Sequence, residues 1–73
     1  MKLSKNQYQF IVNSDVEALV AFLHNEQGLS ILDAFDRVYS SRTYEKLSTP
    51  ATGLYLQSPE YIYDYLLEEL ATT

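Results

Sequence analysis

The chain has few side chains that can do acid–base or nucleophilic chemistry, and no motif gathers them. Its one imidazole, His24, stands among polar residues and projects away from the apolar stripe of a predicted helix. A catalytic site needs a base, a nucleophile and a group that stabilises developing charge. The serines and threonines fall at predicted caps and turns, and the sequence contains no G-x-S-x-G elbow, glycine-rich phosphate loop or H-E-x-x-H pair. We therefore predict that the protein is not an enzyme.

Metal and cofactor chemistry has equally little support in the residue types. The sequence has no cysteine and one histidine, which excludes a thiolate site and an imidazole cluster. Asp33 and Asp36 have a spacing that could hold a cation weakly, but they are not part of an EF-hand loop. We interpret them as a solvated helix face, and we expect no metal, no cofactor and no small-molecule ligand.

One carboxylate, Asp15, falls in the middle of an apolar stripe when residues are placed about 100° apart around a helix. Two explanations are open. The helix is interrupted at Asn13-Ser14, where Ser14 and Glu17 would form a second capping box, or Asp15 is partly buried and bonded to a hydroxyl or a cation. We favour a continuous helix. A functional buried acid is a third interpretation of Asp15, although structural carboxylates are more common.

The elements that carry these residues are all predicted to be helices. A capping box at Ser4 and Gln7 and a terminal glycine, Gly28, predict a first helix over about 5–27. Ser30 caps a second helix, which the doublet Ser40-Ser41 ends. A short helix over 43–47 follows, then a packed loop over 48–57 with 54–56 as a short extended piece. Ser58 and a proline start the last helix, to about residue 70.

The predicted fold is therefore all-α: a compact single domain over residues 1–73, with three longer helices, one short helix and a packed loop before the last helix. The second helix is amphipathic, with one arc formed by Ile31, Leu32, Phe35, Val38 and Tyr39. The predicted core consists of Tyr8, Ile11, Val12, Leu19, Leu23, Phe35, Val38, Leu47, Ile62, Leu66 and Leu70.

Six of the seven tyrosines lie between Tyr39 and Tyr65, and the last helix divides its own tyrosines into two sets. Tyr63 belongs to the apolar arc and is predicted to be structural. Tyr61 and Tyr65 lie four residues apart on the opposite side, among acidic residues. An off-core aromatic pair with carboxylates suits a partner that carries Lys, Arg or aromatic groups. The predicted partner-binding residues are Tyr61, Tyr65, Asp64 and Glu68.

A second interpretation of this tyrosine pair is structural. Tyrosine rings often lie along a core rim with the hydroxyl in water, and the loop over 54–56 could fold across them. Under the first interpretation the partner is another protein, or a second copy of the chain. Full burial of both Tyr61 and Tyr65 would exclude the proposed surface.

Charge favours a protein partner over nucleic acid. Ten acids against five bases give a net charge of −5, and no base follows Lys46. Residues 30–47 have the outline of a helix-turn-helix, so a DNA-binding regulator that uses 41–47 is the alternative function. This segment sets Arg37, Arg42 and Lys46 against as many acids, and an acidic domain repels phosphates.

The sequence also has no apolar run long enough for a membrane span and no apolar leader, so we expect a cytoplasmic protein without membrane contact.

Several short motifs are spread from about Phe10 to Leu70. They are Phe10-Ile-Val12, Leu29-Ser-x-x-Asp-Ala-Phe35, Val38-Tyr-Ser-Ser41, Thr43-Tyr44 and Ser58-Pro-Glu-Tyr-Ile-Tyr63. Together they resemble a family of small uncharacterised bacterial proteins, a domain of unknown function. Members are cytoplasmic and are often encoded beside proteins that resemble ADP-ribosyltransferases. The resemblance implies an accessory or antitoxin-like role and carries over no catalytic residue.

Overall fold

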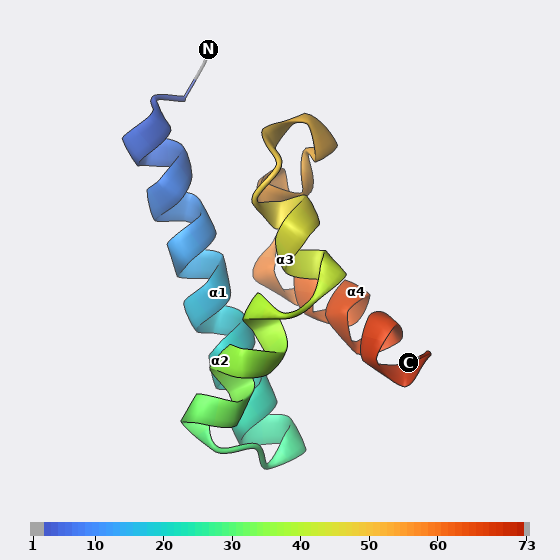
Figure 1. Ribbon diagram of the computed structural model, residues 1–73. Coiled ribbons are helices and arrows are strands. Elements are labelled where there is room, and N and C mark those ends of the chain that lie inside the picture. Colours follow the sequence, from blue (N-terminus) through green and yellow to red (C-terminus); the bar gives the residue numbers. More distant parts are fainter. Residues whose placement is uncertain (1–2, 73) are drawn as a thin grey trace.

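The computed structural model describes residues 3–72, and within them every regular element is a helix (Figure 1). The prediction of an all-α fold with three longer helices and one short one is confirmed. The helices are α1 (Lys5–Gln27), α2 (Ile31–Tyr39), α3 (Arg42–Leu47) and α4 (Pro59–Ala71). Two 3-10 turns, η1 (Pro50–Thr52) and η2 (Leu54–Leu56), occupy the loop before α4.

Each of the four α-helices begins at a serine. The side chains of Ser4, Ser30, Ser41 and Ser58 each accept a hydrogen bond from the backbone N–H three residues later. This bond satisfies one of the donors that a helix start leaves open. At α1 the Gln7 side chain also accepts from the Ser4 backbone N–H, which completes the predicted capping box. Local sequence therefore sets where these helices begin.

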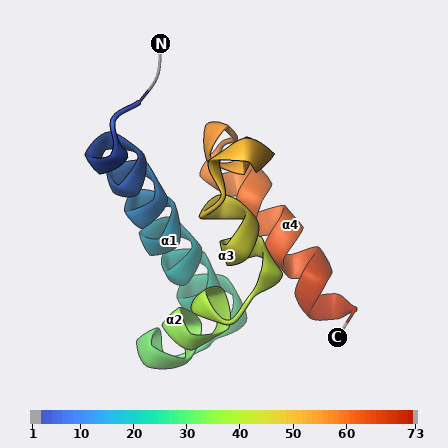
Figure 2. The same cartoon turned by 45° about the horizontal axis from the view of Figure 1, so that its top comes forward.

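The helices pack in a fixed order in space. After Gly28, whose φ of 75° gives the left-handed turn, α2 folds back across the C-terminal half of α1 (Figure 1). Helices α3 and α4 lie beside each other on the other side of the molecule, and the turns η1 and η2 join them at one end (Figure 2). The N-terminal half of α1 contacts this end through Tyr8, whose hydroxyl donates to the Leu47 carbonyl.

The core follows the predicted apolar faces closely. Seven of the predicted residues are buried: Val12, Leu19, Leu23, Val38, Leu47, Ile62 and Leu66. Tyr8, Phe35 and Leu70 are half-buried and pack against them, and Ile11 is also half-buried. Val16, Val20, Ala34 and Leu54 extend the core. One compact unit therefore encloses a single core.

The loop before α4 departs from prediction. Residues 54–56 were expected to be extended, but they form the 3-10 turn η2, in which Leu54 is buried and Leu56 is 71% exposed. Gly53 adopts a φ of 70° between the two turns, and the Thr52 hydroxyl donates to the Lys46 carbonyl at 2.6 Å. These local bonds favour tight turns over an extended backbone.

Candidate interaction surface on helix α4

The two tyrosine sets predicted for α4 are present in the structure. Tyr63 is 5% exposed and its ring lies 4.8 Å from the Phe22 ring, centroid to centroid. Tyr61 is 53% exposed, and Tyr65 is half-buried. The condition that would have excluded the surface, full burial of both rings, is not met.

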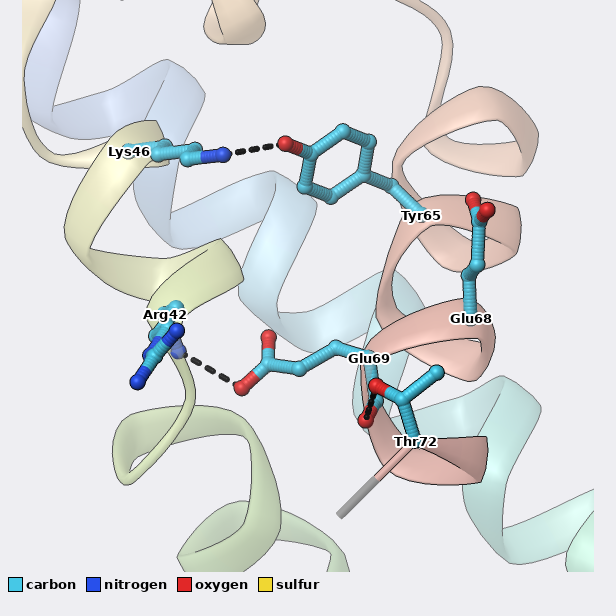
Figure 3. A pocket seen from close by; sticks show the side chains of 6 residues that line it. All are labelled: Arg42, Lys46, Tyr65, Glu68, Glu69 and Thr72. Carbon is cyan, nitrogen blue, oxygen red and sulfur yellow. Dashed lines mark hydrogen bonds between the residues drawn. The ribbon is translucent and has the colours of Figure 1, made fainter.

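Tyr65 is bonded to a lysine on α3. The Lys46 ammonium donates a hydrogen bond to the Tyr65 hydroxyl, and its nitrogen lies 4.7 Å from the centre of the Tyr65 ring (Figure 3). The ammonium lies beyond the hydroxyl end of the ring and not over its face, so the contact is a charge-assisted hydrogen bond. The α4 surface therefore already holds one cationic group, supplied by its own chain.

The Lys46–Tyr65 pair separates two hollows. One, of about 310 Å³, lies between η2 and α4 and is lined by Tyr61, Gln57, Leu54 and the 52–53 backbone region together with the pair. The other, of about 390 Å³, lies between α3 and α4 and is lined by Arg42, Glu68, Glu69 and Thr72 together with the pair (Figure 3). Tyr65 therefore lines both hollows, and Tyr61 lines the one between η2 and α4.

The predicted carboxylates Asp64 and Glu68 are both exposed. Among residues 3–72 neither takes part in a hydrogen bond or an ion pair with a side chain of the protein. They leave the α4 surface with unpaired negative charge beside the exposed Tyr61 ring. Such a surface attracts cationic groups and raises their rate of encounter.

Glu69 is bonded within the protein, unlike its neighbours Asp64 and Glu68, and no local sequence pattern predicts this. Its carboxylate accepts from the Arg42 and Thr43 backbone N–H groups, both at 2.9 Å, and from the Thr43 hydroxyl at 2.8 Å. Partial burial acts to raise the pKa of Glu69, but these hydrogen bonds, with the nearby Arg42 charge, together hold it below the usual value. Glu69, which lies on α4, therefore caps the N-terminus of α3.

Helix α1 is continuous through Asn13 and Ser14, as we favoured, and Asp15 is only 6% exposed. The expected partner is missing: within the described part of the chain, Asp15 Oδ2 is buried and accepts no hydrogen bond. Burial raises the pKa of Asp15 to about 6. The expectation of a bonded hydroxyl or cation is therefore wrong for this oxygen.

Asp15 and His24, the carboxylate and the imidazole that the sequence analysis considered for acid–base chemistry, do not meet. His24 lies nine residues from Asp15 on α1, about 13 Å along the helix axis. It is exposed, and its Nδ1 lies 2.7 Å from the Leu29 carbonyl oxygen, so a protonated Nδ1 donates to the chain that leaves α1. Residues 3–72 hold no group of three or more His, Cys, Asp or Glu side chains placed to bind a metal ion.

The segment with the helix-turn-helix outline does not contain a helix suited to reading DNA bases. Helix α3 has six residues, and its Thr43 side chain is fully buried. Its basic residues Arg42 and Lys46 line the hollow shared with α4, opposite Glu68 and Glu69. Recognition helices present several base-reading side chains to the major groove, and α3 offers little room for them.

Within residues 3–72 no helix combines the length and the apolar character that crossing a membrane requires. No protein-family model matches the chain, and comparison with curated proteins and with solved structures found no match.

Proposed function

We propose that the protein is a non-catalytic interaction module that binds a partner protein through Tyr61, Tyr65, Asp64 and Glu68. The observation that carries the proposal is the exposure of Tyr61: a large ring, 53% exposed, stands off the core at the edge of a hollow. The exposed half of this ring adds nothing to the buried core, whereas tyrosine is among the residues that contribute most to binding.

The chemistry of the surface favours a partner segment that carries lysine or arginine. Lys46 supports this preference, because its ammonium donates a hydrogen bond to the Tyr65 hydroxyl. Tyr61 offers a second ring of the same kind, and Asp64 and Glu68 supply unpaired negative charge beside it. A cationic side chain on Tyr61 would gain both the ring and the carboxylates.

The biological setting is part of the proposal. The resemblance described above implies a cytoplasmic bacterial protein with an accessory or antitoxin-like role, whose partner could be encoded by a neighbouring gene. An acidic, non-catalytic domain with one aromatic recognition surface is compatible with that role.

Affinity capture from the native host, with the tagged protein as bait, tests the proposal. We expect Tyr61→Ala to reduce the amount of a specifically retained protein at least about tenfold, because truncating a central interface tyrosine costs about 2 kcal/mol or more. Phe10→Ala is the matched control, since Phe10 is 71% exposed on the side of α1 away from the core. Equal retention by the wild type and the Tyr61→Ala variant, both shown to be folded by circular dichroism, would exclude the surface.

A second pair of changes separates the ring from the charge. Asp64→Asn combined with Glu68→Gln keeps both rings and removes two charges. We expect this variant to retain less partner and to lose the salt dependence of the interaction, because attraction between exposed charges is screened by salt.

A further inference from the structure

Helix α2 leaves most of its predicted apolar arc uncovered. Ala34 and Val38 are fully buried against α1, but Leu32 is 81% exposed, Tyr39 is 50% exposed and Ile31 is 46% exposed. Phe35 is half-buried between them. At about 100° per residue these side chains share one continuous arc, which lies beside the strip of Ala34 and Val38 that α1 covers. Large contiguous apolar patches that a soluble protein leaves exposed mark interaction sites.

The aromatic residues of this face are held in place by one another. The Phe35 and Tyr39 rings are stacked, with centroids 6.0 Å apart and planes 10° apart. The Tyr39 ring also meets the Tyr44 ring of α3 edge to face at 4.9 Å. A surface that is already ordered loses less conformational entropy when it binds.

The spacing along α2 is symmetric about Phe35. Ile31 lies four residues before it and Tyr39 four residues after it. If two α2 helices pack antiparallel about a twofold axis at Phe35, Phe35 meets its own copy, and Ile31 of each chain lies opposite Tyr39 of the other. A twofold interface requires this self-complementary arrangement, because the same patch serves both chains.

Charge also favours a second copy at this face. The side chains of this face, Ile31, Leu32, Phe35 and Tyr39, carry no charge, and α2 holds two acids, Asp33 and Asp36, and one base, Arg37. Helix α2 therefore carries −1 of the net charge of −5, and the rest of the chain carries −4. Two like-charged molecules repel least where each is neutral, whereas a strongly basic partner would be drawn to the acidic α4 surface instead.

We propose that the protein forms a symmetric dimer in which α2 packs antiparallel against α2 of a second copy, around Phe35. This surface is separate from the one formed by Tyr61 and Tyr65. A contact centred on one nine-residue helix is smaller than the ~1,200 Å² at the low end of specific interfaces, so the dimer is weak. We expect a dissociation constant of roughly 10–100 μM, which keeps dilute protein monomeric.

Sedimentation equilibrium from about 5 μM to 1 mM tests the dimer. The average mass should rise from 8.4 kDa towards twice that value as concentration increases. Leu32→Glu should weaken dimerisation at least about tenfold, because it places a charge in the apolar contact. Leu56→Glu is the matched control: it adds the same charge at a leucine that is 71% exposed near the other surface, and it should leave the dimer intact.

An introduced cysteine tests the orientation, since the sequence contains none. Phe35→Cys places two thiols beside each other on the twofold axis and should form a disulfide-linked dimer much faster than Leu56→Cys under mild oxidation.

Three results would overturn the proposal. They are a mass that stays at 8.4 kDa at 1 mM, equal weakening by Leu56→Glu and Leu32→Glu, and equal cross-linking rates for the two cysteine variants.

Discussion

At the scale of single residues, Asp15 is the clearest departure from what folding alone would select. Its carboxylate is buried on the core face of α1, and Oδ2 accepts no hydrogen bond from residues 3–72. Removing a carboxylate from water disfavours its charged form, and this burial raises the pKa from 3.8 to about 6. At neutral pH the native state therefore holds a poorly solvated charge.

We predict that Asp15 makes the fold less stable as the pH rises. The native state binds more protons than the unfolded state between pH 3.8 and about 6, so this contribution falls across that window and stays low above it. The cost is at most about 3 kcal/mol at neutral pH, at about 1.4 kcal/mol per pKa unit, and partial access to solvent reduces it.

Asp15→Asn should increase the free energy of unfolding at pH 8 by about 1–2 kcal/mol, and the gain should shrink towards pH 5. Urea denaturation of the two proteins across this range measures the difference. An equal difference at pH 5 and pH 8 would contradict the account of Asp15.

The sequence predicted the position of Asp15 but not its surroundings. Helical periodicity alone places it among Tyr8, Val12 and Leu19, so its burial could be anticipated. Whether a hydroxyl or a cation would reach it depends on residues that arrive from other helices. No local pattern records that information.

At the scale of elements, Glu69 joins the C-terminal part of α4 to the first turn of α3. It supplies the acceptors for two backbone N–H groups and for the Thr43 hydroxyl, in addition to the cap from Ser41. Tyr8 makes a corresponding link at the other end of α3, through the Leu47 carbonyl. A helix of six residues is too short to be stable alone, so these tertiary bonds help to maintain it.

We predict that Glu69→Gln lowers the free energy of unfolding by about 1–2 kcal/mol, because the amide has one acceptor oxygen in place of two and lacks the charge. Glu68→Gln is the control: Glu68 is exposed and makes no such bonds, so its variant should match the wild type. Urea denaturation at pH 7 measures both. Equal stability of the two variants would show that the Glu69 contacts contribute nothing.

The same contacts set a second dependence on pH, opposite in sign to that of Asp15. Because the folded-state pKa of Glu69 is lowered, its contribution is present above the unfolded value of 4.5 and is lost as the pH falls through the folded value. In the Glu69→Gln variant this acid-sensitive contribution should be absent.

The sequence predicted where the helices begin, but it did not predict which distant residues form hydrogen bonds with them. Ser4, Ser30 and Ser58 each stand where a local cap is needed, and a cap bond spans three residues. The bonds from Arg42 and Thr43 to Glu69 span 27 and 26 residues. Residues 54–56 are an exception, because local bonds around Gly53 and Thr52 form a 3-10 turn where the sequence predicted an extended piece.

At the scale of the whole molecule, several large apolar side chains lie outside the core, and two groups of them form the proposed surfaces. One is the ring of Tyr61 beside the acidic residues of α4, and the other is the uncovered face of α2. They differ in charge as well as place, since the α4 surface is acidic and the side chains of the α2 face are uncharged. A dimer formed through α2 would therefore carry two α4 surfaces, one on each chain, and could bind two partner molecules at once.

The candidate site was predictable only in part. Wheel geometry separated Tyr63 from Tyr61 and Tyr65, and the structure agrees in burial. The role of Lys46 was not predictable, because it reaches Tyr65 from a different helix, 19 residues away. The exposure of Leu32 was missed for a similar reason: α2 is amphipathic, but α1 covers only the part of its arc around Ala34 and Val38.

The most direct test of the interaction surface is a photo-cross-linking residue placed within it. Tyr61→p-benzoylphenylalanine, produced in the native host and irradiated, should form a covalent adduct with a partner heavier than a second copy of the 8.4 kDa chain. The same substitution at Phe10 is the control, because Phe10 is also exposed but lies outside the surface. We predict an adduct from position 61 and none from position 10. Equal adducts from both positions, or none from position 61, would contradict the assignment of this surface to partner binding.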